Sequence, residues 1–395
     1  MAKKTQRTNF LSMFKNFSVL KASVSFLVFY CIIVMLIIIW HFEIPCKGSA
    51  KTPKIIALYG VKNRIGEKLL YERTKITAEK LGWKVIGACV DERLLEYRVT
   101  RHFYYVAASI LNLLYKPQFN LAVTHYIYML PHGYNVVYLN VPSDKLFGFD
   151  GDFKESFEHL GRYNAYADLY SVTHIKNHAL ENALRKSHNK DALIIPVYLA
   201  QNYIEYSPAT PDKMLFTGSL WGCSRESIRI MNLLQRFAAE DLLVAYGIKK
   251  NQLENLGNKY KGFIEDYDKN KSAIDNIINV HKKYGIALII HTLEHMIEHI
   301  PTSRIAEAIA SGAIVITDEN PFIKKNFGDN VLYFNSLEEA EEMYEDVMHQ
   351  LEWIRQNPEK AEEKARAAHK ILMENFSLEL QLQKLDKQLN FKAIS

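Results

Sequence analysis

The sequence predicts an α/β chain built from two doubly wound, Rossmann-like domains, and three observations support this class. Short runs rich in Val, Ile and Leu, typical of buried parallel strands, alternate with longer amphipathic stretches, and glycines follow several of those stretches. With 395 residues and 48% apolar composition, the chain is long enough for two cores. We expect domains at 54–197 and 214–375, a linker at 198–213 and a helical tail at 376–395.

The first predicted domain begins with a βαβ unit. A strand at 55–60, a helix at 64–81 closed by Gly82, and a strand at 84–90 make up this unit. A helix at 93–114 and strands at 120–128, 134–141 and 192–197 continue the pattern. Gly60 and Gly66 match neither the Walker spacing nor the dinucleotide fingerprint, so no phosphate loop is predicted here.

The second predicted domain repeats the alternation. Its predicted strands are 214–217, 242–246, 286–290 and 313–316, with a short edge element at 261–264, and its helices are 226–240, 271–284 and 301–311. Asn357-Pro358 separates two long amphipathic stretches, 337–356 and 359–389, and Glu338 to Glu345 reads as a solvated acidic face.

The segment 301–334 combines a helix, a buried strand and a polar cluster. Pro301 and Thr302 suit a helix start, where Thr or Ser can cap free amides, and Gly312 suits the positive φ of a helix end. The strand 313–316 runs into the polar residues 317–320. Because ligands of open α/β sheets bind outside the carboxyl ends of strands, we expect this cluster and the helix start to line one crevice.

Arg304 and Glu307 lie on the first turn and a half of that helix. Helix amides and an arginine favour a phosphate, and a carboxylate one turn deeper can accept hydrogen bonds from two neighbouring hydroxyls. Together they would hold a nucleoside diphosphate and its ribose. The same i,i+3 spacing also suits an ordinary surface ion pair, which remains the alternative.

An apolar run from Ala22 to Trp40 carries no charge and is long enough to span a bilayer core. It predicts a transmembrane anchor at 22–40, between a basic tail at 1–21 and a linker at 41–53. A cleaved signal peptide, with Gly48-Ser49-Ala50 near the cleavage site, is the alternative. Basic residues are more numerous before the run than after it, which favours a single-pass protein with a cytoplasmic N-terminus. Basic and acidic residues alternate throughout the tail, so no nucleic-acid footprint is predicted.

Two features of the first domain are catalytic candidates. His125 follows the apolar run 121–124, where a neutral imidazole could take a proton from a hydroxyl nucleophile, although most histidines in such places are only packed. Asp150 and Asp152 resemble an Asp-x-Asp motif with which one architecture of glycosyltransferases binds a divalent metal ion. Asp-Gly-Asp is also an ordinary turn, which we prefer here.

The succession GSLWGCSR, LLVAYG, KGFIED, IALIIH, PTSRIAEAIASGAIVIT and FGDNVLYFNSLEEAEEM resembles the nucleotide-sugar half of GT-B fold glycosyltransferases. The pattern Arg-x-x-Glu-Ala-x-Ala-x-Gly is most similar to the spore-maturation-type branch. The resemblance extends over about 212–385 and is only architectural over 54–195. Many retaining relatives carry a glutamate eight residues before the position of Glu307, where this chain has His299 beside Glu298.

The resemblance implies a glycosyltransferase that moves a sugar from a nucleotide diphosphate donor to a hydroxyl of a glycan, lipid-linked or protein acceptor. It implies no cofactor and no required metal, because arginines and helix termini can stabilise the leaving diphosphate. His125 and Arg304 are the catalytic candidates. The alternative is a non-catalytic membrane adaptor that binds a sugar nucleotide or a glycan. The donor-site candidates are Gly218, Ser219, Arg225, Tyr246, His291, Ser303, Arg304 and Glu307.

Overall fold

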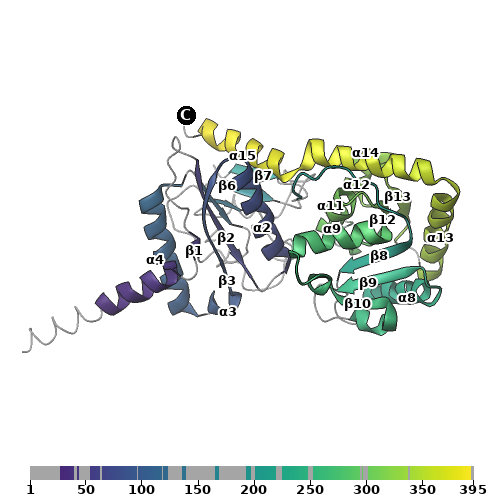
Figure 1. Ribbon diagram of the computed structural model, residues 1–395, viewed down its shortest axis with the longest axis horizontal. Coiled ribbons are helices and arrows are strands. Elements are labelled where there is room, and N and C mark those ends of the chain that lie inside the picture. Colours follow the sequence, from purple (N-terminus) through teal and green to yellow (C-terminus); the bar gives the residue numbers. More distant parts are fainter. Residues whose placement is uncertain are drawn as a thin grey trace, which may run out of the picture.

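The computed structural model has two α/β lobes side by side, and the last helices run along both of them (Figure 1). It describes residues 27–39, 42–43, 54–62, 65–95, 97–117, 119–122, 136–138, 165–168, 193–196, 201–218, 225–247, 252–293, 296, 301–336 and 339–392.

The first lobe contains a seven-stranded sheet in the order β1-β3-β2-β4-β5-β6-β7. All neighbours are parallel except β1, which pairs antiparallel with β3. The strands are Phe42–Glu43, Ile55–Val61, Lys84–Val90, Phe119–Ala122, Val136–Tyr138, Ala165–Asp168 and Leu193–Pro196 for β1 to β7. The helices are α2 (Ile65–Lys80), α3 (Glu92–Leu95) and α4 (Arg98–Tyr115).

The predicted parallel sheet of the first domain is confirmed, while two of its strands were not predicted. Phe42–Glu43 lies at the sheet edge within the stretch predicted as a linker. Ala165–Asp168 is an inner strand between β5 and β7. Both segments are too short to show a hydrophobic period, so only their pairing reveals them.

The second lobe contains a fully parallel six-stranded sheet in the order β10-β9-β8-β11-β12-β13. These strands are, from β8 to β13, Lys213–Gly218, Leu243–Gly247, Tyr260–Phe263, Gly285–Ile289, Ile314–Asp318 and Leu332–Phe334. The helices are α8 (Arg225–Ala239), α9 (Ala273–Tyr284), α11 (Ser303–Ala310) and α12 (Pro321–Phe327), and β10 lies at the edge as predicted.

Both faces of the second sheet are buried, which explains why its strands read as continuous apolar runs. Ile314 and Ile316 of β12 belong to a core formed with α8 and the long helix α13 (Ala340–Gln356). Val315, between them, faces the opposite core, formed with α11 and α14 (Pro358–Phe376). Consecutive β-branched residues therefore serve two different cores.

The C-terminal stretch predicted as one helix, 359–389, is two helices, α14 and α15 (Leu378–Lys392). Ser377 between them has ψ 145°, and the Leu378 amide donates to the Gln201 carbonyl at 2.9 Å. The contact with the interdomain linker therefore sets the bend. Beyond it α15 packs against α2 of the first domain and Lys54 pairs with Asp386, so the terminal helix crosses back from the second lobe to the first (Figure 1).

Helix α2 of the first domain contacts the second domain. Its Leu69 joins a buried cluster with Leu215, Val244 and Tyr246 of the second sheet. The linker passes closely over the second domain, since a Cβ on Gly312 (φ +80°) would meet the Ser207 carbonyl oxygen at 2.1 Å. The predicted helix end at Gly312 is thus required both by its backbone conformation and by the linker.

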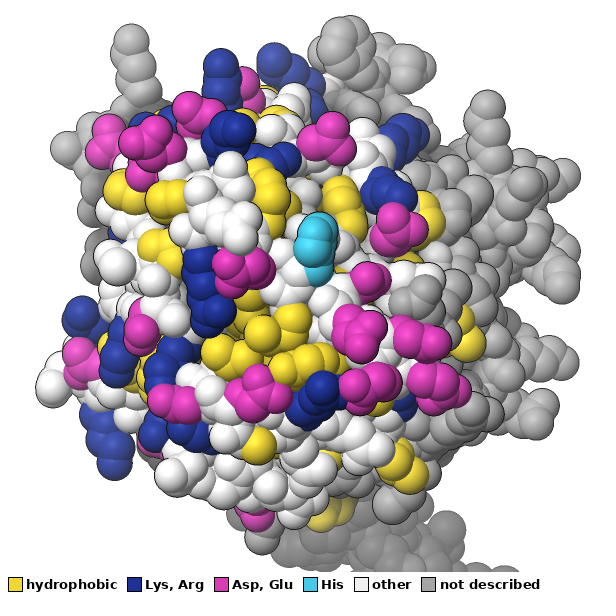
Figure 2. Space-filling model, turned by 90° about the vertical axis from the view of Figure 1, so that its right-hand side faces the viewer, with side chains coloured by type: hydrophobic (Ala, Val, Ile, Leu, Met, Phe, Trp, Pro, Cys, Tyr) yellow, Lys and Arg dark blue, Asp and Glu magenta, His cyan; other side chains and the backbone are white. Residues whose placement is uncertain are grey.

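The face of the second domain turned away from the first carries acidic and basic side chains close together (Figure 2). Glu339, Glu341, Glu342 and Glu345 of the α13 segment are exposed, in agreement with the predicted acidic face. Glu341 also pairs with Arg236 of α8.

The described part of the predicted anchor is a helix over residues 27–39. Within the portion of the chain that the structure describes, no helix has both the length and the apolar character needed to cross a membrane. Residues 22–26 and Trp40 of the predicted span lie outside the described residues.

Candidate donor site at the strand ends of the second domain

Arg304 lies where the direction of strand succession in the second sheet reverses. Counted in chain order, the strands lie 3-2-1-4-5-6, so the reversal falls between β8 and β11. The Arg304 guanidinium donates through Nη1 to the Thr217 carbonyl at 3.0 Å and through Nη2 to the Ile290 carbonyl at 2.8 Å. Thr217 is in β8 and Ile290 follows β11. Arg304 thus bridges the two strands at the crevice where open α/β sheets bind ligands.

Gly218 makes room for that guanidinium. A Cβ at position 218 would lie 3.0 Å from Arg304 Nη1, and the glycine has φ +149°. Because this backbone conformation and this close approach both exclude larger residues, the end of β8 requires glycine. The sequence placed Gly218 and Arg304 in one site, and the structure brings them into contact.

His291 organises the N-terminus of α11. Its backbone amide donates to Asp318 Oδ2 at 2.5 Å, its Nδ1 lies 2.7 Å from Asp318 Oδ1, and the Thr302 amide donates to its Nε2 at 3.1 Å. Because Nε2 accepts, the proton is on Nδ1 and is donated to the carboxylate. The imidazole therefore satisfies the backbone amide of the N-cap residue Thr302, whereas the predicted Thr302 side-chain cap does not form.

Glu307 lies one turn deeper in α11 and is only 5% exposed. Its Oε1 accepts from Nη2 of Arg73, on α2 of the first domain, at 3.0 Å, and both side chains are buried. The ion pair of Glu307 is thus formed across the domain interface and not with Arg304, whose guanidinium donates to carbonyls. A buried carboxylate without this cation would carry a large desolvation penalty.

The charge of Arg304 is held in a protein environment instead of water. Burial lowers the pKa of its guanidinium, and the carboxylates of Asp318 and Glu307 oppose that change. The guanidinium also lies 5.6 Å from the centre of the Phe216 ring. Of its five N–H donors, two serve the strand carbonyls, which leaves donors for an anionic ligand.

The other predicted residues fall into two groups. Ser303 is the exposed first residue of α11, Arg225 begins α8, and Tyr246 pairs in register with Thr217 on the neighbouring strand. Tyr246 packs against Tyr267 and Tyr284, with ring centroids 6.1 and 6.4 Å away, and burial raises the pKa of its hydroxyl. The predicted residues outside the described part of the chain are Ser219, His125, Asp150, Asp152, Glu298 and His299.

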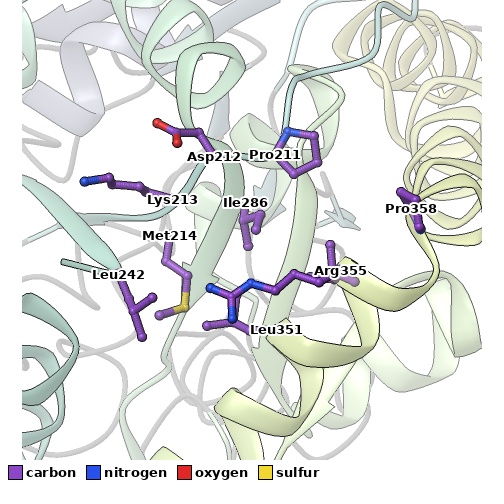
Figure 3. Close-up of a pocket in the computed structure, with 10 residues that line it drawn as sticks. Pro211, Asp212, Lys213, Met214, Leu242, Ile286, Leu351, Arg355 and Pro358 are labelled. Carbon is purple, nitrogen blue, oxygen red and sulfur yellow. The ribbon is translucent and has the colours of Figure 1, made fainter. Parts of the chain in front are cut away.

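The described residues contain no metal-binding cluster, and one cavity among them lies far from this location. No group of three or more His, Cys, Asp or Glu side chains in them could hold a metal ion. A cavity of about 210 Å³ lies at the opposite, amino-terminal end of the second sheet (Figure 3). It is lined by Pro211, Asp212, Lys213, Met214, Leu242, Ile286, Leu351, Ile354, Arg355 and Pro358.

Residues 236–386 match the family model described as "Glycosyl transferase-like". This part of the chain therefore resembles a glycosyltransferase domain. It includes α11 with Arg304 and Glu307, as well as His291 and Asp318. The match begins after β8. Gly218 and Thr217 therefore lie outside it and are assigned to the site only by their closeness to Arg304. Among curated proteins, no sequence matches the chain.

Two of the similar solved structures, with TM-scores above 0.5, support the fold. An alpha-glucosyltransferase, solved with UDP and a 13-mer DNA containing an HMU base, has 11% identity and a TM-score of 0.58 over 86% of this chain and 100% of its own. Anabaena Alr3699/HepE, solved with UDP and glucose, has 13% identity and a TM-score of 0.53 over the same shares. The pneumococcal O-GlcNAc transferase GtfA, solved with UDP and GlcNAc, has 14% identity and a TM-score of 0.46 over 73% of this chain. The match spans 60% of the GtfA chain.

Arg73 and the roles of Asp318 and His281 were not predicted from the sequence. Arg73 lies in a helix of mixed polar and apolar residues, and only the packing of α2 on the second domain shows that it faces Glu307. Asp318 was part of the predicted polar cluster, but its role as the acceptor for His291 depends on two neighbouring strands ending together. His281 carries no motif and is found only through its burial near Arg304.

Proposed function

We propose that the protein transfers a sugar from a nucleoside diphosphate donor to a hydroxyl of a glycan, lipid-linked or protein acceptor. The observation that carries the proposal is the position of Arg304, which is bonded to the strand ends on both sides of the sheet's topological switch point. The match to the glycosyltransferase-like family over the same region supports it. UDP is the nucleotide named for the neighbours with similar folds, so UDP-sugars are the first donors to test.

In this proposal the diphosphate binds at Arg304 and the N-terminus of α11. Negative charge develops on the leaving diphosphate as the glycosidic bond breaks, and a fixed cation stabilises it more in the transition state than in the ground state. No metal is needed for that step. Asp318 and His291 act as positioning residues, because they hold the first turn of α11 through its Thr302 amide.

Glu307 accepts hydrogen bonds from the two ribose hydroxyls in the donor complex. In the structure Arg73 donates a hydrogen bond to this carboxylate. Donor binding therefore requires Arg73 either to move away or to donate to the carboxylate together with the ribose hydroxyls. The separation of α2 from α11 would accomplish this, and their return would exclude water from the transfer reaction. His125 remains the proposed base that takes the acceptor proton.

A panel of nucleotide sugars tests the proposal. Purified protein is incubated with each donor, and released nucleoside diphosphate is measured with and without added acceptors. We expect release from at least one donor and its loss in Arg304→Ala, while Arg355→Ala, at the opposite end of the sheet, retains it. If the protein binds nucleotide but releases nucleoside diphosphate from no donor, the enzyme proposal is wrong. The non-catalytic adaptor that binds a sugar nucleotide would then be the function.

The adaptor is the second candidate because Glu307 is closed off by a buried cross-domain ion pair. A binding protein that kept the fold would bind the sugar nucleotide without turnover. Equilibrium binding and turnover measured on the same preparation distinguish the two functions. A third candidate, a metal-dependent transferase using Asp150 and Asp152, predicts that a chelator abolishes activity and that Asp150→Asn with Asp152→Asn does the same. We expect activity to persist.

Two finer assignments belong to the proposal. The pattern from Arg304 to Gly312 supports the spore-maturation-type branch. The uncharged run 22–40 supports a single membrane anchor with a cytoplasmic N-terminus, and the exposed apolar side chains of the helix over 27–39 agree with a lipid environment. Glycosylation or protease mapping of the two flanks in membranes tests the orientation.

A further inference from the structure

Helix α4 has an apolar side that faces away from the protein. Val99, Leu113 and Leu114 are 68%, 68% and 69% exposed, and Ile110 is also exposed. Val99, Ile110 and Leu113 are separated by about three turns and one turn, so they share one side of the helix, with Leu114 beside them. We call these four residues the α4 stripe.

The α4 stripe does not contribute to the core of its own domain. The core side of α4 is formed by other residues, Tyr104, Ala107, Ala108 and Leu111, all of which are buried. Asn112 on that side donates to the Tyr59 hydroxyl at 3.0 Å and fixes the helix on β2. Single exposed apolar residues need no explanation, but large aliphatic side chains grouped on one helix face indicate contact with another apolar phase.

The same side of α4 is contacted by the helix over residues 27–39. The Tyr30 hydroxyl lies 2.8 Å from His102 Nε2, and its ring centroid lies 5.0 Å from that of Phe103. The helix otherwise exposes apolar side chains, namely those of Leu27, Val28, Phe29, Ile32, Met35, Leu36 and Ile39. The stripe and the exposed apolar side chains of this helix therefore lie on the same side of the first domain.

The arrangement of the two helices suits a bilayer. The helix over 27–39 projects away from the first lobe, whereas α4 lies against the side of that lobe that faces away from the second (Figure 1). A bilayer surface into which the helix over 27–39 inserts would therefore also contact the outer side of α4. Lys116, exposed at the C-terminal end of α4, can extend toward headgroups while the apolar side chains enter the acyl boundary.

We propose that the α4 stripe lies in the interfacial region of a lipid bilayer, next to the entry point of the helix over 27–39. This deepens the proposed membrane anchoring and does not depend on catalytic activity. The contact fixes the first domain against the lipid surface and directs the second domain, with its donor site, away from it. The first domain then moves little relative to the membrane.

Quenching by brominated phospholipid tests the contact. Full-length protein is reconstituted into phosphatidylcholine and phosphatidylglycerol vesicles, with and without bromine on the acyl chains, as the parent, Leu113→Trp and Ile228→Trp. Ile228 is the matched control, because it is an exposed aliphatic residue (51%) on α8 of the second domain. The four native tryptophans are common to all three proteins and are subtracted.

We expect bromolipid to quench the fluorescence of the tryptophan introduced by Leu113→Trp by half or more. The tryptophan introduced by Ile228→Trp should be quenched no more than a tryptophan exposed to water. Equal quenching at both positions, in protein that floats with the vesicles, overturns the α4 contact and leaves the anchor intact. Protein that does not float overturns both. Release of nucleoside diphosphate, measured in detergent, reports on the transferase separately.

A second copy of the chain is the rival occupant of the stripe. The double variant Leu113→Glu with Leu114→Glu is compared with the parent by light scattering in detergent. We expect the same mass for both. A parent dimer that becomes a monomer in the variant would assign the surface to self-association and overturn the lipid proposal.

Discussion

The Arg73 guanidinium of the first domain lies 3.0 Å from the Glu307 carboxylate of the second, and both side chains are buried. This ion pair connects α2 directly to the helix that carries the proposed donor site. Asn202 of the linker supports it, since its side-chain amide donates to the Arg73 carbonyl at 3.1 Å and to Thr77 Oγ1 at 2.5 Å. If Glu307 binds ribose as proposed, domain closure and its availability to the donor are therefore coupled.

The first prediction concerns Arg73→Met, which keeps much of the side-chain volume and removes the charge. Loss of one partner from a buried pair leaves the other charge uncompensated, at a cost of about 3–5 kcal/mol. We expect a lower melting temperature without ligand and tighter binding of the nucleoside diphosphate, because ribose no longer competes with Arg73. Thermal shift and titration calorimetry measure the two effects.

Arg355→Met is the matched control for that variant. Arg355 pairs with Glu352 on the exposed side of α13, where such pairs contribute about 0.5 kcal/mol or less. Its melting temperature and nucleotide affinity should remain close to those of the parent. Weaker nucleotide binding by Arg73→Met would mean that Arg73 itself contacts the donor.

The second prediction separates Glu307 from Arg304. Glu307→Gln replaces a charged acceptor with an amide, so donor affinity should fall by about 1.5–3 kcal/mol, while turnover at saturation changes less. Arg304→Ala removes the cation beside the leaving diphosphate, so turnover should fall about a hundredfold or more. Unchanged affinity and turnover with lower melting temperatures would reduce both residues to structural roles.

The sequence predicted the second domain more completely than the first, for physical reasons. Buried parallel strands such as Ile314–Asp318 carry a strong local pattern, and Gly312 marks a helix end that the linker also requires. The cluster of Gly218, His291 and Arg304 could be predicted because all three adjoin strand ends. The Arg73–Glu307 pair could not, since a partner 234 positions away along the chain leaves no local signal.

The third prediction concerns Gly218→Ala. A Cβ there would lie 3.0 Å from Arg304 Nη1, in a backbone conformation that L-residues rarely adopt. We expect the guanidinium to be displaced from the Thr217 carbonyl, with turnover reduced in the same direction as in Arg304→Ala. Gly262→Ala is the control for strain alone, because Gly262 also has positive φ (+91°) and a Cβ there would meet nothing within 4 Å. Equal activity of the two variants would show that the close approach to Arg304 does not matter.

The last prediction is a pH dependence of stability caused by His281 of α9. His281 is buried, and within the described residues neither ring nitrogen has a hydrogen-bond partner. Burial, and secondarily the charge of Arg304, lower the pKa of its imidazole to about 3 from an ordinary value of 6.5. Between these pH values the unfolded chain binds a proton at this position that the folded protein does not. The neutral, buried His281 therefore adds its full contribution to the free energy of unfolding above pH 6.5. That contribution is lost as the pH falls toward 3, and the loss is about 5 kcal/mol at most.

Replacement by leucine isolates this effect from the titration of carboxylates. His281→Leu removes the ionisable group, so its free energy of unfolding should fall less steeply than that of the parent between pH 6.5 and 4. His349→Leu is the control, because His349 is exposed on α13 and should leave the slope unchanged. Chemical denaturation at half-unit pH intervals gives the three slopes. Parallel curves for the parent and His281→Leu would mean that the His281 imidazole becomes protonated in the folded protein as readily as in the unfolded chain, and the buried, neutral imidazole beside Arg304 would have to be abandoned.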